Sequence, residues 1–280
     1  MGRKKRVVTM SKDKIIYRLL TLMLFLTGTS IAGSNHGTTL KVCYDQWAPM
    51  TIFPSQGSPA RGVVIDMLEQ IYTSKGYKLE YYEVPLARGL AMVADGLCDM
   101  LPEYLYSKNS ENDFEYATEE TFAYTSAFVV RRDDPWHYNG VQSIKGKRIA
   151  TGPGWDYSSM SSDYQNYIDD PKNSDLVEVL AGDGDVVKRI FRMIKENRVD
   201  LYADSDLVLQ HVLNQLKLNE DLKIVRPGLE KKLLERPIFS KKMPAEKRQE
   251  LIKIWNGGRL SMKGKKETIL LKKYNITLEE

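Results

Sequence analysis

The 280-residue sequence contains only two cysteines and three histidines, which removes several classes of metal-binding and catalytic site. His36 lies near the start of the chain, and neither His137 nor His211 has a Cys or His at metal-ligand spacing. No GxSxG elbow, HExxH helix or P-loop occurs, so the motifs of serine hydrolases, zinc proteases and P-loop enzymes are absent. We expect no metal and no cofactor, although carboxylates and tyrosines can still transfer protons in an enzyme.

A basic surface is also lacking once residues 1–33 are set aside. Seven of the 41 Lys and Arg residues and one of the 37 Asp and Glu residues lie there, which leaves 34 basic and 36 acidic residues. A net charge of −2 on the rest gives no argument for nucleic-acid binding. The remaining residues, about 247, are enough for one large domain or two lobes with their own cores.

Long apolar runs are missing except for one near the start, which has the pattern of an export signal. Seven basic residues precede the apolar segment 19–26, and Ser30 and Ala32 supply small residues for cleavage. The run is shorter than the roughly 20 apolar residues of a membrane helix, although an uncleaved anchor is the alternative. No Cys stands at the cleavage region, and either Met1 or Met10 can be the true start. We expect a signal peptide at 1–33 and a periplasmic protein.

The rest of the chain alternates between strand and helix patterns, which predicts an α/β fold with right-handed crossovers and a parallel sheet. Strands are expected at 40–44, 78–84, 98–101, 127–130, 147–151, 176–180, 199–203, 222–226 and 237–240. Helices are expected from Val63 to before Gly76, from Pro85 to before Gly96, from about Tyr157, from Val186 after a cap at Asp183 or Asp185, and at 206–217, 244–256 and 264–273. Residues 107–120 are polar and predicted to be irregular.

Both cysteines fall in predicted core strands, Cys43 in 40–44 and Cys98 in 98–101. An exported chain can form disulfides, and the two residues can form one if their strands are neighbours. Two buried free thiols fit the pattern equally well. The sequence therefore leaves the pairing of these cysteines open.

Two of the predicted strands lead directly into polar and aromatic side chains. Residues 40–44 are followed by Asp45, Gln46 and Trp47, and residues 147–151 are followed by the segment GPGWDY (152–157). Open α/β sheets bind ligands just beyond the carboxyl ends of their strands. Two such strand ends predict two lobes that close on a small molecule.

The loop that begins at Thr151 can bind an anion. Gly152 and Gly154 lie between a predicted strand and a predicted helix, so backbone N–H groups and the helix dipole can face a carboxylate there. The alternative is a plain strand-to-helix turn that binds no ligand.

Aromatic and acidic side chains share these predicted sheet edges. The rings can stack on a ligand or face a cation, and a carboxylate can hold an ammonium group through charge-assisted hydrogen bonds. Each acid could instead be a helix cap or a solvated charge. Arg88 falls in the first turn of a helix, where the dipole disfavours a cation, so it either binds an anion or lies along the lobe surface. The candidate ligand-binding residues are Tyr44, Asp45, Trp47, Arg88, Glu103, Tyr104, Thr151, Gly154, Trp155 and Asp204.

The order and spacing of several segments, rather than any single motif, resemble the periplasmic solute-binding proteins of ABC importers, in the family typified by polar amino-acid binders. The resemblance covers nearly all of the chain after residue 33. The segments that carry it are LKVCYDQWAPM (40–50), GVVIDMLEQIYTSKGYKLEY (62–81), PLARGLAMVADGLCDML (85–101), SIKGKRIATGPGW (143–155), ENRVDLYADSDLVL (196–209) and WNGGRLSMKGKKETILLKKY (255–274).

This resemblance implies a two-lobed, type II periplasmic-binding-protein fold, in which each lobe is a mostly parallel sheet flanked by helices. It places two hinge segments near 121–124 and 231–236, lobe one at 37–121 plus 236–280, and lobe two at 122–235. Such proteins close on a ligand by a hinge motion and present the closed form to the permease of an ABC importer. It also implies that this chain is a monomer. By position, Asp45 and Trp47 match ligand contacts, and Thr151 with Gly154 matches the loop that receives the ligand's carboxylate.

The chain departs from the family's pattern at both ends of the usual amino-acid grip. Family members carry an Arg after the third strand, where this sequence reads Ser-Lys-Asn-Ser at 107–110. Lys108 lacks the bidentate fork of an Arg, and Arg88 on the neighbouring helix is the other substitute. The family's ammonium-binding Asp is expected five residues after Asp200, which is Ser205, and Asp204 lies one position short of it.

The expected ligand is therefore a small polar organic solute, either an amino acid or a relative of one, or a cationic amine held by aromatics and carboxylates. Two other functions stay open. One is an enzyme on the same scaffold, such as a dehydratase with Glu103 or Asp204 as acid or base. The other is a ligand-sensing partner of a membrane signalling receptor.

Overall fold

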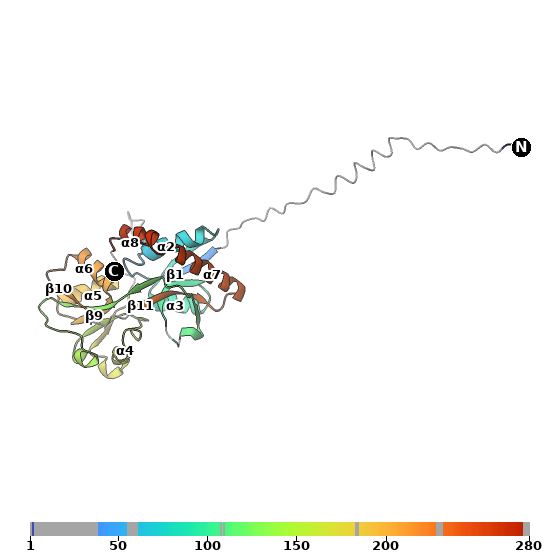
Figure 1. The fold of residues 1–280 in the computed structure, drawn as a ribbon. Helices are drawn as coiled ribbons and strands as arrows, with labels where there is room; N and C mark the ends of the chain where they lie inside the picture. Colours follow the sequence, from blue (N-terminus) through green and yellow to red (C-terminus); the bar gives the residue numbers. More distant parts are fainter. Residues whose placement is uncertain are drawn as a thin grey trace. The chain divides into compact units, whose positions relative to one another are not determined.

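Two mixed β-sheets organise the chain between Thr39 and Ile276 (Figure 1). The computed structural model describes Gly2 and residues 39–54, 61–106, 108, 110–182, 185–227 and 232–276. The candidate cap Asp183, Lys231 in an expected hinge segment and, apart from Gly2, the expected signal peptide at 1–33 therefore lie outside the described residues. By their contacts, residues 37–280 form one unit, distinct from residues 1–36.

The first sheet combines a parallel part with an antiparallel part. Strands β2, β1 and β3 are parallel neighbours, and β11 runs antiparallel to β3. The carboxyl ends of β1 and β3 therefore meet at one edge, as the alternating pattern predicts. In spatial order the strands are β2 (Lys78–Glu83), β1 (Thr39–Tyr44), β3 (Met100–Leu105), β11 (Leu233–Ser240) and β4 (Phe114–Tyr116), with β5 (Phe122–Tyr124) paired to β11.

The second sheet has the same mixture of strand directions. Its parallel part is β9, β7 and β8, and β6 runs antiparallel to both β9 and β10. In spatial order the strands are β10 (Leu222–Val225), β6 (Ser126–Arg131), β9 (Leu201–Ser205), β7 (Ile149–Thr151) and β8 (Val177–Val179).

The chain passes between the sheets twice. It goes from β5 to β6 through Thr125, and it returns from β10 to β11. The two connections lie side by side, because β5 and β11 pair in an antiparallel ladder with Leu233 opposite Tyr124 and Glu235 opposite Phe122. The segments that the resemblance assigns to the hinge are thus largely paired strands.

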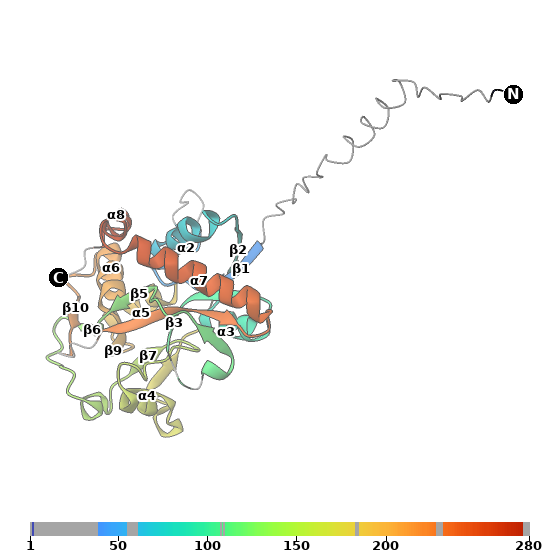
Figure 2. The same ribbon diagram turned by 45° about the vertical axis from the view of Figure 1, so that its right-hand side comes forward.

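Helices cover both sheets. On the first sheet, α7 packs on β11 beside α2, and α3 packs on β1 and β3 (Figure 2). On the second sheet, α5 and α6 pack on β6, and α6 also contacts β9 and β10. The helices are α2 (Val63–Thr73), α3 (Leu86–Ala94), α4 (Ser162–Asp169), α5 (Val186–Lys195), α6 (Asp206–Leu216), α7 (Ala245–Met262) and α8 (Lys265–Lys273), with short 3₁₀ turns at η1 (Ser110–Asn112), η2 (Val141–Ile144) and η3 (Pro171–Asn173).

Helix α5 shows how the sequence specifies these elements. The Asp185 carboxylate accepts a hydrogen bond from the backbone N–H of Lys188 and so caps the helix. Val187, Ile190 and Ile194 recur at helical spacing and are almost fully buried in the core of the second sheet. Removing each such side chain from water stabilises the fold by about 1.5–3 kcal/mol before entropy is counted. The predicted helix and its cap at Asp185 are confirmed.

Three local predictions were wrong. The strand expected at 98–101 begins at Met100 and continues to Leu105, so Cys98 lies in the bend before it. The polar helix expected from about Tyr157 begins only at Ser162, because the Ser161 hydroxyl accepts a hydrogen bond from the N–H of Tyr164 and caps it there. The segment 107–120, expected to be irregular, contains η1 and β4.

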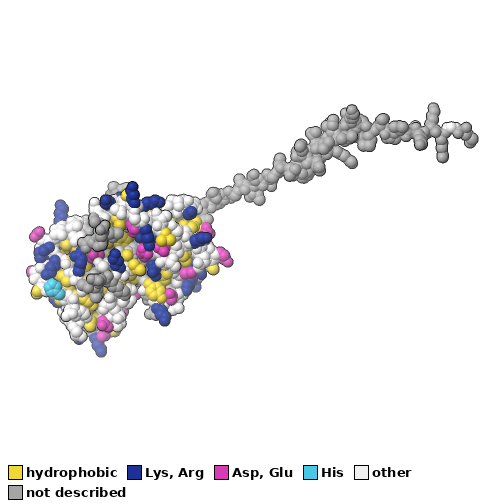
Figure 3. Space-filling view, in the orientation of Figure 1, with side chains coloured by type: hydrophobic (Ala, Val, Ile, Leu, Met, Phe, Trp, Pro, Cys, Tyr) yellow, Lys and Arg dark blue, Asp and Glu magenta, His cyan; other side chains and the backbone are white. Residues whose placement is uncertain are grey.

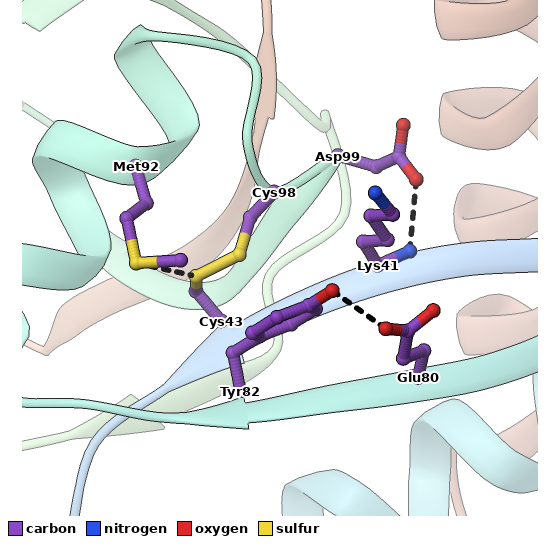
Figure 4. The surroundings of a disulfide bond; sticks show 7 residues. All are labelled: Lys41, Cys43, Glu80, Tyr82, Met92, Cys98 and Asp99. Atoms are coloured by element: carbon purple, nitrogen blue, oxygen red, sulfur yellow. Dashed lines mark hydrogen bonds between the residues drawn. A yellow bond between two sulfur atoms is a disulfide. The ribbon is translucent and has the colours of Figure 1, made fainter.

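Cys43 and Cys98 form a disulfide that joins β1 to the bend before β3 (Figure 4). The thioether of Met92 in α3 lies against it, with 3.8 Å between its sulfur and that of Cys43. The backbone N–H of Lys41 in β1 also donates a hydrogen bond to the Asp99 carboxylate at 2.8 Å, which holds β1 and the bend before β3 together. The disulfide resolves the alternative that the sequence left open.

None of the helices within the described residues combines the length and the apolar composition needed to cross a bilayer.

Candidate functional site

An open pocket lies between the two sheets and receives side chains from both. It encloses about 700 Å³ of space free of atoms, part of which is continuous with solvent. From the first sheet and its loops the lining residues are Asp45, Trp47, Leu86, Glu103, Tyr104, Leu105, Tyr124, Leu233 and Glu235. From the second sheet and its loops they are Ser126, Trp155, Asp156, Tyr157, Met160, Tyr202, Ala203 and Asp204.

Three carboxyl groups of the first sheet come together on its side of the pocket. Asp45 follows β1, Glu103 lies in the neighbouring β3, and Glu235 lies in β11, which pairs with β3. The Thr51 hydroxyl donates to Glu103 Oε1 at 3.0 Å, and the Tyr124 hydroxyl donates to Glu235 Oε1 at 3.1 Å. Glu103 Oε2 is buried and has no hydrogen-bond partner. Among the described residues, the side-chain donors to Glu103 and Glu235 are thus neutral hydroxyl groups, and Glu103 Oε2 meets none.

Burial and mutual repulsion make these three carboxyl groups hard to ionise. Loss of solvent raises the pKa of Asp45 to about 7, and the nearby Asp204 carboxylate adds to the rise. Burial raises the pKa of Glu235 to about 8, against the effect of the bond from Tyr124 and with a further rise caused by Asp45. Burial and the charge of Glu235 hold the pKa of Glu103 well above its usual range. Without a cation, protons are the counter-charge that this part of the pocket favours.

Asp204, at the end of β9, supplies the carboxylate of the second sheet. It accepts hydrogen bonds from the indole N–H of Trp47 (3.0 Å to Oδ1), from the Tyr202 hydroxyl and from the backbone N–H of Ser205 (2.6 Å). Burial raises its pKa to about 6 despite these donors. The bond from Trp47 crosses the pocket and connects the loop after β1 directly to the second sheet.

Aromatic rings form much of the pocket wall. Trp47 makes an edge contact with Tyr124, with ring centroids 5.8 Å apart, and Trp155 lies 5.6 Å from Tyr202 in a tilted arrangement. Tyr104 and Tyr157 add two further rings from the two sheets. Ring faces of this kind attract cations, and their edges pack against apolar groups.

The pocket differs sharply from the outer surface in charge. On the face drawn in Figure 3, basic and acidic side chains are interspersed. In contrast, no Lys, Arg or His is found among the described residues that line the pocket, although five of them are Asp or Glu. Within the described part of the chain, no group of three or more His, Cys, Asp and Glu is arranged to hold a metal ion.

The structure brings six of the ten sequence-predicted site residues to this pocket. They come from four separate strand ends, two in each sheet, as the rule for open α/β sheets predicts. The six are Asp45, Trp47, Glu103, Tyr104, Trp155 and Asp204.

The other four predicted residues do not line the pocket. Tyr44 is fully buried in the core beneath α2 and donates its hydroxyl to Glu83, because successive side chains of β1 point to opposite faces. Thr151 is buried and donates to the Tyr157 hydroxyl. Arg88 is exposed on α3. Gly154 is exposed and has φ +83°, and an added Cβ would lie 3.2 Å from the backbone of Ala87.

Several lining residues escaped the sequence reasoning, and two of them left a usable signal. Tyr202 lies two positions before Asp204 in the same strand, so the strand period places both on one face. Glu235 is an acidic residue that follows the apolar pair Leu233 and Leu234 in β11, and it is only 7% exposed. Nothing in the local sequence marked Tyr124, because residues 121–124 were expected only as a crossing segment between the lobes.

Solved structures with the same fold support this architecture. A histidine kinase sensor domain with similarity to periplasmic binding proteins aligns over 86% of this chain and 98% of its own, at 15% identity and TM-score 0.68. An ancestral arginine-binding protein bound to arginine aligns over 85% and 98%, at 18% identity and TM-score 0.67. A substrate-binding protein of an ABC uptake transporter from Streptococcus pneumoniae with bound histidine aligns over 85% and 92%, at 16% identity and TM-score 0.66.

At these identities the structures establish the fold alone. Among curated proteins, no sequence matches this chain. The model of the bacterial extracellular solute-binding proteins, family 3, matches residues 40–280. That match covers almost all of the chain after the expected leader, so the protein belongs to the bacterial extracellular solute-binding proteins of family 3.

Proposed function

We propose that this protein captures a small polar organic solute in the periplasm and delivers it to the permease of an ABC importer. In this proposal residues 37–121 plus 236–280 form one lobe and residues 122–235 the other. The lobes close on the solute by a hinge motion at β5 and β11, and the protein acts as a monomer. The candidate ligand contacts are the six predicted residues that line the pocket.

The observation that carries the proposal is the construction of the pocket from both sheets. Each sheet contributes acids and aromatic rings, and the Trp47 indole donates to Asp204 across the space between them. In the described elements, the chain passes from one sheet to the other at the β5–β6 and β10–β11 connections. A site divided in this way changes whenever the sheets move relative to each other, which suits a receptor that closes on its ligand.

A thermal-shift screen with amino acids, amines and organic acids tests capture directly. A solute that binds the folded protein raises its melting temperature by mass action, by an amount that corresponds to about 2.7 kcal/mol at a hundredfold excess over Kd. The screen must give at least one reversible ligand with one-to-one stoichiometry in titration calorimetry. If every compound leaves the melting temperature unchanged, capture of solutes of these classes is wrong.

Intrinsic fluorescence then tests whether the ligand enters this pocket. Trp155→Phe should clearly reduce the ligand-induced change, because this indole lines the pocket together with Trp47. Trp136→Phe is the matched control, because that ring packs in the core of the second sheet and its N–H donates to the Ser143 carbonyl. An equal loss in both variants would place the ligand elsewhere.

A sensing role is the second candidate function, and the histidine kinase sensor domain of the same fold favours it. Deletion of the gene should abolish uptake of the solute at low concentration if the partner is a permease. Unchanged uptake, together with a lost transcriptional response to the solute, would favour the sensor. Incubation of the purified protein with its ligand, followed by recovery of the ligand unchanged, separates both roles from an enzyme.

A further inference from the structure

We propose that the pocket selects an organic cation that carries N–H donors and has no carboxylate, so that it binds an amine in preference to the corresponding amino acid. This inference rests on the proposed function, because it names the class of solute that the same pocket captures.

The first argument is the charge of the pocket. Five described lining residues are acidic and none is basic. The only basic residue next to a pocket acid in sequence is Arg236, which follows Glu235 in β11 and lies opposite Tyr104 of β3 in the ladder. Its Nε is buried without a hydrogen-bond partner, and Arg236 is not among the lining residues. A ligand carboxylate in this space would meet like charge without a partner, which is strongly unfavourable when desolvated.

The second argument is the unpaired oxygen of Glu103. This side chain is only 5% exposed, lines the pocket, and keeps Oε2 without any hydrogen-bond donor. A buried carboxylate oxygen with no donor is costly, and native structures usually satisfy such atoms with a ligand, water or ion. An ammonium or guanidinium N–H is the donor that satisfies this oxygen and also supplies the missing positive charge.

The third argument is that the groups expected to bind a ligand carboxylate do not reach the pocket. Arg88 and Lys108, the candidate substitutes for the family's Arg, are both exposed and are not lining residues. The loop after β7 also fails as an anion site. Helix α4 begins at Ser162, and its first turn is already capped by Ser161, so the helix N-terminus is not at the two glycines. Within the loop, Asp156 adds a negative charge to the pocket.

The fourth argument is the aromatic wall. Trp47 follows a strand of the first sheet and Trp155 follows a strand of the second, both line the pocket, and each contacts a tyrosine that also lines it. A cation placed between carboxylates and indole faces gains both charge-assisted hydrogen bonds and cation–π attraction.

Protons and the cation compete for the same carboxylates. Binding should release protons and strengthen as the pH rises from about 6 to about 8, because the pKa values of Asp45 and Glu235 are raised to about 7 and about 8. The ionisable groups that face this site from the elements around it are Asp45, Glu103, Tyr104, Tyr124, Asp156, Tyr157, Tyr202, Asp204 and Glu235. All of them are acids that lose a proton as the pH rises, so none of them would make cation binding weaker at higher pH.

Matched pairs of compounds test the proposal. Titration calorimetry of the full chain, dialysed free of bound solute, should be run with agmatine and arginine, cadaverine and lysine, and histamine and histidine. The members of each pair share the same cationic end and differ by a carboxylate. At least one amine should bind, and it should bind about 10- to 100-fold more tightly than its amino acid, the range of one or two charge-assisted contacts.

Glu103→Gln should weaken the binding amine about tenfold or more, because it removes the charge but keeps the shape. Glu80→Gln is the matched control, since Glu80 is exposed on β2 and bonds only to Tyr82 among the contacts described for its side chain. A measurement on the unaltered chain keeps the test independent of folding of the variant. The amine's affinity should rise between pH of about 6 and about 8, with proton release seen in buffers of different ionisation enthalpy.

Binding of an amino acid as tightly as its amine would overturn this inference while leaving solute capture intact. Failure of all three amines to bind would also overturn it, and the wider thermal-shift screen then decides capture separately. An affinity that stays constant or falls with rising pH would contradict the role of the carboxylates.

Discussion

Asp200 and Asp204 lie only four residues apart, at opposite ends of β9, yet their environments are opposite. Asp200 receives the Arg148 guanidinium at 2.6 Å and the Arg148 backbone N–H at 2.8 Å, and these contacts hold its pKa below the usual range although partial burial acts in the other direction. Among the described residues, Asp204 receives neutral donors only, and burial raises its pKa to about 6. The same side chain is therefore a structural ion pair at one end of the strand and an uncompensated charge at the other.

The comparison extends to the rest of the molecule. The buried Arg259, 3% exposed, is paired with Glu267 at 2.6 Å and donates to the Glu120 carbonyl. Glu103 and Glu235 are buried to a similar degree, and no basic residue is found among the described residues lining the pocket they share. Because an unpaired buried charge costs several kcal/mol, a cluster of them is expected where something else supplies the counter-charge.

The largest expected effect is a dependence of the free energy of unfolding on pH. Asp45, Glu235 and Asp204 have folded-state pKa values raised to about 7, 8 and 6, so near neutral pH the folded protein holds protons that the unfolded chain has released. Stability of the ligand-free protein should therefore fall as pH rises from about 5 to about 8, by about 4–8 kcal/mol in total, because a tenfold change in each proton equilibrium corresponds to ~1.4 kcal/mol. Urea unfolding across this range measures it.

Asp200 changes the stability with pH in the opposite direction. Its lowered folded-state pKa gives stability that is present at neutral pH and is lost as the pH falls through that value. The stability maximum should accordingly lie near pH ~5, between the two effects. A profile that is flat, or that rises towards pH ~8, would show that the pocket acids are compensated by groups we have not identified.

Glu235→Gln should sharpen the same contrast. The amide oxygen can still accept the bond from Tyr124, while the buried charge disappears. At pH ~8 the ligand-free variant should be about 2–4 kcal/mol more stable than the unaltered chain, with little difference at pH ~5, where Glu235 is already protonated. Chemical denaturation at both pH values measures this, and Glu80→Gln should stay within about 0.5 kcal/mol at each. A destabilised Glu235→Gln would mean that the carboxylate is paired in the ligand-free protein.

Arg148→Gln should remove the ion pair of Asp200 and lower the stability of the protein. It removes the guanidinium from Asp200 and the bonds to the Asn197 carbonyl and side chain. Because the Arg148 side chain is 40% exposed, the expected loss is only about 1 kcal/mol. A double-mutant cycle with Asp200→Asn should give a coupling energy of about 0.5–1 kcal/mol. A coupling energy of zero would mean that this ion pair does not contribute to stability.

The smallest expected effect comes from Trp47→Phe. This change removes the indole donor from Asp204 but keeps an aromatic ring in the pocket. The pKa of Asp204 should rise further, and stability at neutral pH should fall by about 0.5–1 kcal/mol. Carboxyl-carbon NMR titration follows Asp204 directly. Trp136→Phe also loses one indole hydrogen bond, and it should leave that titration unchanged.

Much of the fold follows from local sequence patterns. Periodicity and caps predicted α5, and apolar runs placed β1, β2 and β6 within one or two residues of their observed ends. The start of the strand predicted at 98–101 was misplaced because Cys98 is an apolar, fully buried residue and so resembles a core strand position, although it lies in the bend before β3. The start of α4 was misplaced because the sequence gives no measure of how long a turn continues before a cap such as Ser161.

The site was predictable only in part, for a reason that lies in its construction. Asp45 and Trp47 follow a recognisable strand, so the strand-end rule finds them. Glu235 and Tyr124 become pocket residues only because β11 returns beside β3 and β5, a long-range pairing that no local pattern records. The contrast between Asp200 and Asp204 depends likewise on the position of Arg148, which lies 52 residues upstream of Asp200 in the sequence.

The hydrogen bond between Tyr124 and Glu235 has a mechanical consequence. These residues belong to β5 and β11, the strands at the two chain connections between the sheets, and both of their side chains line the pocket. If the lobes close as we propose, a solute that draws the Glu235 carboxylate towards itself would also displace the paired strands β5 and β11. Ligand binding and the angle between the lobes would then be coupled through this one hydrogen bond. No further group of residues would be needed to convert ligand binding into a change of conformation.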